Sequence, residues 1–209
     1  MLMAIASSRL AVSSKARSLS TLHCRNIAHM TAVGMVLAAG EGKRFGGPKA
    51  PYEFEGERLV DRAVRHLKEA GCDQVFVVLG AWVGDVPGAT VVINDEWEAG
   101  VGSSLRAGLK HIKDNSSADR VVISLVDMPG VTPEALRRIA NHQDPVVVAT
   151  FDGKVGHPVA FHRETWKDLI DAAKGHKGAR KFLKNKVPAS TKVEVGDIAS
   201  GEDLTERPD

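Results

Sequence analysis

The chain has 209 residues, of which 43% are hydrophobic and 26% charged, and its formal net charge is +2 at pH 7. These values are typical of a globular protein of about one domain, and they give no reason to expect nucleic acid or a membrane surface as a partner. Cys24 and Cys72 lie far apart and in no CxxC or Cys/His spacing, which argues against a disulfide framework or a zinc site and favours a reducing, cytoplasmic setting.

The first thirty residues differ in composition from the rest of the chain. They are rich in Ser and Ala and contain four basic residues but no acidic one. Three interpretations stay open: an organellar transit peptide, a segment translated or added ahead of Met30, and a disordered arm. We treat residues 1–30 as an extension and expect one domain over residues 31–209.

Short β-branched runs alternate with amphipathic segments after this extension. In chain order, the pattern predicts a strand at residues 33–39, a helix at 59–70, strands at 74–80 and 89–95, a helix at 103–112, a strand at 120–127, a helix from 132, strands at 144–151 and 157–162, helices at 163–173 and 178–184, and a strand at 191–197.

Local signals support two of these helices. One helical face carries Leu59, Val60, Val64 and Leu67, and Gly71 follows at the C-terminal cap. Residues 132–134 read Thr-Pro-Glu, which combines an N-cap, a proline in the first turn and an early acid.

Strands that are apolar throughout and separated by helices indicate βαβ units and a mostly parallel sheet. We therefore expect an α/β fold, a single three-layer α/β/α domain with a Rossmann-like nucleotide-binding sheet. Ligands of such sheets bind at the carboxyl ends of the strands. Two polar features stand there: the loop after residues 33–39, and Asp127.

The loop at residues 37–49 reads LAAGEGKRFGGPK and matches neither common phosphate-binding loop. A dinucleotide-binding fingerprint, G-x-G-x-x-G, needs a glycine where Phe45 stands. A P-loop needs its lysine directly after the second glycine, where Pro48 removes an amide donor.

What remains is a glycine-rich, cationic loop. The amides of Gly40 and Gly42 can approach phosphate oxygens, Arg44 can form a fork onto a triphosphate, and Lys49 supplies a point charge. The alternative is a tight turn whose cations are only solvated.

The same stretch resembles the L-A-A-G-x-[GS]-x-R-[FM]-G-x-P-K signature of nucleotidyltransferases that use an NTP and release pyrophosphate. The resemblance covers most of residues 33–197, because VGSSLRAGL, LVDMPGVTPE and GHPVAF follow in the order seen in the molybdopterin cytidylyltransferase-like branch of the MobA-like molybdenum cofactor nucleotidyltransferases. Guanylyltransferase relatives usually carry Asp where this chain has Pro48, which favours CTP over GTP.

The resemblance assigns expected roles around the nucleotide. Arg44, Lys49 and Asp127 are the expected catalytic residues: the two cations hold the triphosphate and Asp127 binds Mg²⁺, although Asp127 could also be a turn residue. The residues expected to bind the nucleotide are Leu37, Ala38, Ala39, Gly40, Gly42, Arg44 and Lys49, together with Gly102, Ser103 and Ser104 at a helix start that Arg106 follows. For Ser103 or Ser104 a simple N-cap is the alternative.

The second substrate is expected at His157, Lys177 and Arg180. His157 could instead be a core histidine, and the two cations could be a solvated helix end. Asp197 is the best candidate for a second metal carboxylate. Relatives commonly carry a second acid near the C-terminus where this chain has Thr205, which puts a two-carboxylate site in doubt.

Three functions follow from the resemblance. The first is a Mg²⁺-dependent transfer of a nucleoside monophosphate from an NTP to a phosphorylated pterin such as molybdopterin. The second is an NAD(P)H-dependent reductase similar to nicotine blue oxidoreductase. The third is a non-catalytic carrier that delivers the molybdenum cofactor to a molybdenum hydroxylase. For the nucleotidyltransferase, such a hydroxylase is also the expected acceptor of the product.

Overall fold

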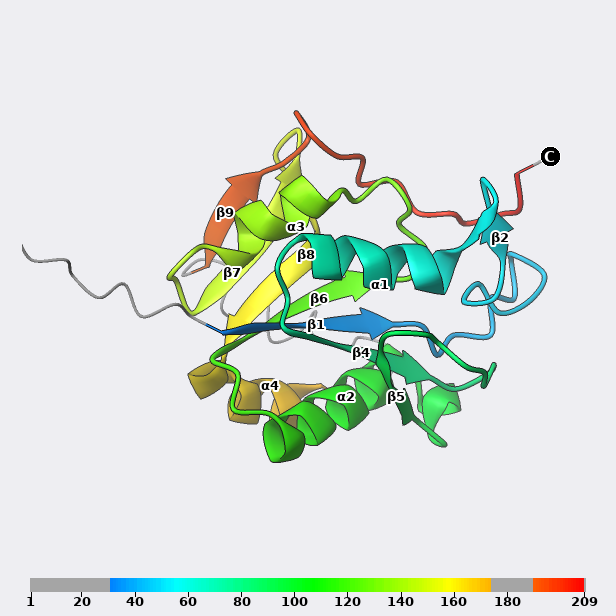
Figure 1. Ribbon diagram of the computed structural model, residues 1–209, viewed down its shortest axis with the longest axis horizontal. Helices are drawn as coiled ribbons and strands as arrows, with labels where there is room; N and C mark the ends of the chain where they lie inside the picture. The colour runs from blue at the N-terminus through cyan, green and yellow to red at the C-terminus, as the bar shows by residue number, and fades with distance from the viewer. Residues whose placement is uncertain (1–30, 174–189, 209) are drawn as a thin grey trace, which may run out of the picture.

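The computed structural model describes residues 31–173 and 190–208, and the statements below concern these residues (Figure 1). The helix expected at residues 178–184, with Lys177 and Arg180, lies outside them. None of the helices in the described part of the chain is long and apolar enough to span a bilayer.

A seven-stranded sheet forms the middle layer, in the order β5-β4-β1-β6-β8-β7-β9. Its strands are β1 (Ala32–Leu37), β4 (Gln74–Leu79), β5 (Thr90–Ile93), β6 (Arg120–Leu125), β7 (Val146–Phe151), β8 (Lys154–His162) and β9 (Thr191–Glu194). Only β8 pairs antiparallel with its neighbours in this sheet, so the mostly parallel sheet is confirmed.

Helices cover both faces of the sheet. Figure 1 shows α1 (Leu59–Glu69) and α3 (Pro133–Ala140) on one side, and α2 (Val101–Asn115) and α4 (Trp166–Ala172) on the other. Short 3₁₀ turns, η1 (Trp97–Ala99) and η2 (Arg163–Thr165), precede α2 and α4. The expected three-layer α/β domain is therefore correct.

Each face of the sheet has its own hydrophobic core, because successive side chains of a strand point to opposite faces. In β1, Val36 packs in the core beneath α1 and α3, whereas Met35 and Leu37 pack in the core beneath α2 and α4. A strand buried on both faces must be apolar throughout, which is the pattern that identified β1 in the sequence.

The local signals at two helices are confirmed. Thr132 Oγ1 accepts a hydrogen bond from Ala135 N at 3.2 Å and caps α3. Gly71 follows α1 with φ +97°, a conformation that glycine adopts without strain.

Strand β8 is longer than expected and runs against the others. A two-residue turn, Asp152 (φ 50°) and Gly153 (φ 76°), folds it back from β7. Because β8 is reversed, its first residues lie at the carboxyl ends of the parallel strands. His157 is brought to that edge, and its Nδ1 lies 3.5 Å from the carbonyl oxygen of Ile123 in β6.

A small hairpin between the glycine loop and α1 was not expected. It consists of β2 (Glu53–Phe54) and β3 (Glu57–Arg58), which pair antiparallel. The turn residues Glu55 and Gly56 have φ values of 54° and 81°. Its strands are mostly polar and only two residues long, so they carry no hydrophobic alternation.

Candidate functional site

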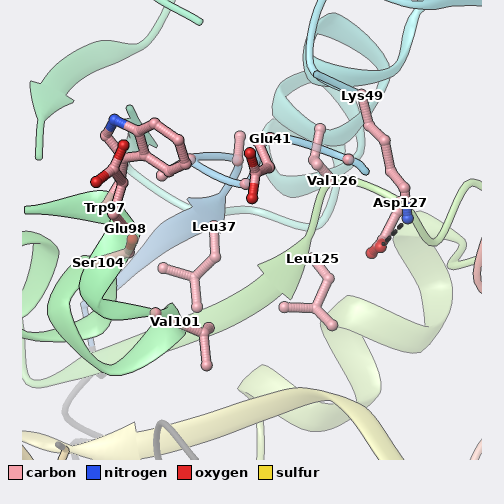
Figure 2. Close-up of a pocket in the computed structure, with 15 residues that line it drawn as sticks. Leu37, Glu41, Lys49, Trp97, Glu98, Val101, Ser104, Leu125, Val126 and Asp127 are labelled. Carbon is pink, nitrogen blue, oxygen red and sulfur yellow. Dashed lines mark hydrogen bonds and ion pairs between the residues drawn. The ribbon is translucent and has the colours of Figure 1, made fainter. Parts of the chain in front are cut away.

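A cavity of about 360 Å³ opens at the carboxyl ends of β1 and β6 (Figure 2). Its walls come from three segments: the glycine loop, the turn that leads into α2, and the end of β6. The lining residues are Leu37, Ala38, Ala39, Gly40, Glu41, Gly42 and Lys49, then Trp97, Glu98, Gly100, Val101 and Ser104, and finally Leu125, Val126 and Asp127.

Lys49 and Asp127 meet at one end of this cavity. Lys49 Nζ lies 2.7 Å from Asp127 Oδ2, and the two side chains are 16% and 22% exposed. The carbonyl oxygen of Asp127 accepts from Leu204 N at 2.8 Å. The predicted catalytic cation and carboxylate, 78 residues apart in sequence, are thus an ion pair within reach of a ligand.

The glycine loop turns sharply around Gly42. The amides of Gly46 and Gly47 donate to Gly42 O at 2.9 and 3.1 Å, and Gly42 has φ +64°. A Cβ on Gly42 would lie 2.0 Å from Gly47 O, so only glycine fits there. The amides of Gly40, Glu41 and Gly42 donate to no acceptor among the described residues and remain available at the cavity wall.

Arg44 is placed differently from Lys49. It is exposed, does not line the cavity, and forms no hydrogen bond or ion pair with any residue in the described ranges. Of the two cations expected to hold the triphosphate, the structure brings only Lys49 to Asp127.

Arg207 holds the glycine loop from outside. Its Nε and Nη2 donate to the carbonyl oxygens of Phe45 and Gly46 at 3.1 and 3.4 Å. Its guanidinium lies 5.5 Å from the ring centroid of Phe45 and 5.7 Å from that of Tyr52, distances typical of cation–π contacts. Sequence reasoning missed this residue because its partners lie more than 150 positions away.

The start of α2 separates its two serines. Gly100 occupies the N-cap, with φ +97°, so neither serine caps the helix and that alternative is wrong. Ser104 lines the cavity, whereas Gly102 and Ser103 are buried without lining it. Arg106 Nη1 donates to Ala173 O at 2.6 Å and so faces the end of α4.

A hydrogen-bonded network fixes these serines. Asn94, which follows β5 and is 5% exposed, donates from Nδ2 to Ser103 Oγ at 2.9 Å and to Ser104 Oγ at 3.0 Å. Its Oδ1 accepts from Glu96 N at 3.1 Å. Ser103 Oγ lies 2.7 Å from Glu96 O and 2.8 Å from Gly100 O, its two possible acceptors.

His157 interacts electrostatically with Asp127. Burial lowers the pKa of His157, and the hydrogen bond with Ile123 O and the negative charge of Asp127 act in the opposite direction. A neutral imidazole at this edge can exchange one proton with a nearby acceptor. His157 thus stands next to the site, although it does not line the cavity.

Asp197, the second carboxylate expected to bind the metal, is paired with Arg138 in the structure, and its role in metal binding stays a prediction. Arg138 of α3 binds it with two hydrogen bonds of 2.8 and 3.1 Å. Asp197 follows β9, which is three strand positions from β6, or about 14 Å. The described residues contain no group of three His, Cys, Asp or Glu side chains arranged to hold a metal ion.

Seven further cavity residues were not predicted: Glu41, Trp97, Glu98, Gly100, Val101, Leu125 and Val126. Figure 2 shows Trp97, Glu98 and Ser104 at one end, with Lys49 and Asp127 at the other. Glu41 occupies a variable position of the loop signature, and η1 is too short for a periodic pattern, so neither could be singled out from the sequence.

Comparisons with known proteins agree with this geometry. The model of the MobA-like NTP transferase domain matches residues 34–192. Nicotine blue oxidoreductase of Paenarthrobacter nicotinovorans is 31% identical over 189 residues, which are 82% of this chain and 90% of that protein. A probable molybdenum cofactor guanylyltransferase of Geobacillus is 28% identical, covering 65% and 72% of the two chains.

Solved structures give the same result. The structure of Rv0371c from Mycobacterium tuberculosis has a TM-score of 0.69 and 27% identity, covering 83% of this chain and 93% of that one. The same protein in complex with manganese has a TM-score of 0.65 and 27% identity, covering 79% and 88%. The chain therefore belongs to the MobA-like NTP transferase family, within the nucleotidyltransferase superfamily.

Proposed function

We propose that the protein is a Mg²⁺-dependent nucleotidyltransferase that moves a nucleoside monophosphate from an NTP, with CTP favoured, to a phosphorylated pterin such as molybdopterin. The observation that carries the proposal is the Lys49–Asp127 pair at 2.7 Å, at one end of a cavity walled by the glycine loop. An oxygen of the acceptor phosphate forms a bond to the α-phosphorus, and the bond to the β-phosphate oxygen breaks and releases pyrophosphate.

The cavity has the chemistry to orient a triphosphate. The unpaired amides of Gly40, Glu41 and Gly42 can donate to phosphate oxygens, and Lys49 can neutralise charge on the departing pyrophosphate. Arg44, exposed on the same loop, is free of described partners and can reach the phosphates only if its side chain turns toward the cavity.

The residues present fit a magnesium ion that arrives with its nucleotide. Mg²⁺ commonly takes one or two carboxylates and completes its coordination with water and phosphate oxygens, so Asp127 alone is sufficient protein ligation. When bound, the ion would supply positive charge that offsets the negative charge of the substrate phosphates. The manganese complex of Rv0371c supports a divalent cation in this family.

The base and the acceptor are proposed from Pro48 and His157. Pro48 before Lys49 favours CTP, whereas the Geobacillus relative carries the name guanylyltransferase. His157, at the edge next to Asp127, is where we propose that the pterin binds. Lys177 and Arg180 lie outside the described residues, and their contact with the pterin phosphate stays a prediction.

The test is a pyrophosphate-release assay of all four NTPs with molybdopterin, with and without Mg²⁺. We expect release that needs both the metal and the pterin and is fastest with CTP. If no NTP supports release and none stabilises the protein against heat in the presence of Mg²⁺, the proposal is wrong.

A reductase is the second candidate, and the observation favouring it is the relative named nicotine blue oxidoreductase at 31% identity. Binding of NADH or NADPH, or flavin absorbance of the purified protein, would support it. A carrier of the molybdenum cofactor is separated from both by Asp127→Ala, since an enzyme loses turnover and keeps binding while a carrier keeps its function.

A further inference from the structure

The network around Asn94 fixes the direction of one hydrogen bond into the cavity. This inference rests on the proposed function, because it concerns how the protein recognises a bound nucleotide. The amide of Asn94 is buried and meets three partners.

The orientation of the amide follows from its partners. Glu96 N can only donate, so the oxygen of Asn94 faces it and the NH₂ group faces the two serines. Both hydrogens of that group are then used, one toward each serine oxygen. Each serine must therefore accept from Asn94.

The two hydroxyl hydrogens are left with different surroundings. Ser103 can donate to Glu96 O or Gly100 O, so its hydrogen stays inside the protein. Ser104 has no acceptor among the described residues, and it lines the cavity. Because Ser104 is only 3% exposed, a hydroxyl with no acceptor among the described residues leaves a hydrogen bond to be made by a ligand.

The position of Ser104 indicates which part of a nucleotide it meets. Figure 2 shows it at the end of the cavity opposite Lys49 and Asp127, near Trp97. The end with the positively charged Lys49 suits the phosphates. The end with the aromatic ring of Trp97 suits the base and ribose.

We propose that Ser104 is a specificity-determining residue that acts only as a hydrogen-bond donor to an acceptor atom of the bound nucleoside, and that Asn94 is the positioning residue that imposes this direction. The acceptor is a base oxygen or an unprotonated ring nitrogen, or a ribose oxygen. Atoms that carry a hydrogen, such as the ring N–H of guanine, are rejected at this point.

The experiment measures the Kd of CTP with Mg²⁺ for single variants. Ser104→Ala should raise the Kd about tenfold, as expected for the loss of one hydrogen bond in a buried site. Ser104→Thr keeps the hydroxyl and should restore most of the affinity. Ser117→Ala is the control, because it removes an exposed hydroxyl beyond the C-terminal end of α2, and its Kd should stay unchanged.

The role of Asn94 is tested with Asn94→Asp, whose carboxylate accepts and would draw the hydrogen of Ser104 away from the ligand. Its Kd should rise as much as that of Ser104→Ala, and the double variant should lose no more than either single one. A purely structural role of Asn94 predicts additive losses instead.

Nucleotide analogues identify the acceptor. 3-Deaza-CTP lacks the ring acceptor and 2′-deoxy-CTP lacks a ribose oxygen, and for the correct analogue Ser104→Ala should cause no further loss. Equal Kd values for Ser104→Ala and the wild-type protein, or an equal loss in Ser117→Ala, would overturn this inference alone. Failure of all four NTPs to bind the wild-type protein would overturn the proposed function as well.

Discussion

Lys49 Nζ lies 2.7 Å from Asp127 Oδ2 and joins the glycine loop to the end of β6. Each charge is the other's partner in the structure, so the protein carries neither a free carboxylate nor a free ammonium at this point of the cavity. Binding of a metal–triphosphate complex offers each of them a new partner of opposite charge, and the pair can then separate without leaving either group uncompensated.

Replacement of Lys49 by Met should lower the rate of pyrophosphate release about 10²- to 10³-fold, because a charge aimed at the leaving group is lost. The free energy of unfolding should fall by about 1 to 3 kcal/mol, since Asp127 loses its partner and the two side chains are mostly buried. Lys110→Met, on the exposed side of α2, is the control and should leave the rate unchanged. Normal turnover of Lys49→Met would contradict the assigned role.

Replacement of Asp127 by Asn should reduce turnover by a similar factor and raise the Mg²⁺ concentration needed for half-maximal activity. The matched variant is Asp197→Asn, whose carboxylate is bound by Arg138 and which follows β9, three strand positions from β6. We expect a metal titration of Asp197→Asn to match the wild type. If the two variants lose metal dependence equally, Asp197 belongs to the metal site after all.

Two glycines of the loop should respond differently to alanine. Gly42→Ala places a Cβ 2.0 Å from Gly47 O at a positive φ and should cost about 2 kcal/mol or more, or force the loop into a new shape. Gly40→Ala meets no atom within 4 Å, so its melting temperature should stay near that of the wild type. Because Gly40 lines the cavity, the same variant should bind CTP more weakly. Thermal melts and titrations of both variants check this contrast.

Arg207→Ala should loosen the glycine loop. The variant loses two hydrogen bonds to loop carbonyls and two ring contacts, which together contribute about 1 kcal/mol for an exposed side chain. Amide hydrogen exchange over residues 42–47 should become faster, and the KM for the nucleotide should rise more than kcat falls. Arg207→Lys keeps the charge but not the forked guanidinium, so its exchange rate and KM should lie between those of Arg207→Ala and the wild type.

Glu194 should make the fold sensitive to acid. Hydrogen bonds from Gly153 N, Thr150 Oγ1, Gly196 N and Asp152 N hold the pKa of Glu194 at about 2, below its ordinary value of 4.5. A lowered folded-state pKa means that this stabilisation is complete above pH 4.5 and is lost as the pH falls toward 2. Glu194→Gln should therefore be less stable at pH 7 and lose less stability between pH 4.5 and 2. Parallel slopes of the two proteins in denaturant titrations would contradict this.

Much of the fold could be predicted because its strands obey simple patterns. β1 is apolar throughout since both of its faces are buried, and the start of α3 was recognisable from three consecutive residues, Thr132 to Glu134. The reversal of β8 was not predictable in this way. A buried strand has the same apolar pattern in either direction, and only the turn at Asp152 and Gly153 distinguishes them.

The site was predictable where one loop or one strand end carries it, as for Lys49 and Asp127. It was not predictable where distant segments meet. Asp197 follows a strand, as Asp127 does, but its strand lies at the edge of the sheet. The order of the strands cannot be deduced from local sequence. Asn94 has no local signal either, since its partners lie on the next helix.

The contact between Arg207 and the glycine loop spans 162 positions of the chain. During synthesis β1 and the loop after it emerge among the first segments of the domain, and domains fold as their segments become available. The loop can take its final support only after Arg207 has left the ribosome. A nascent chain that has completed both hydrophobic cores would therefore still hold an unfinished nucleotide site until Arg207 has been synthesised.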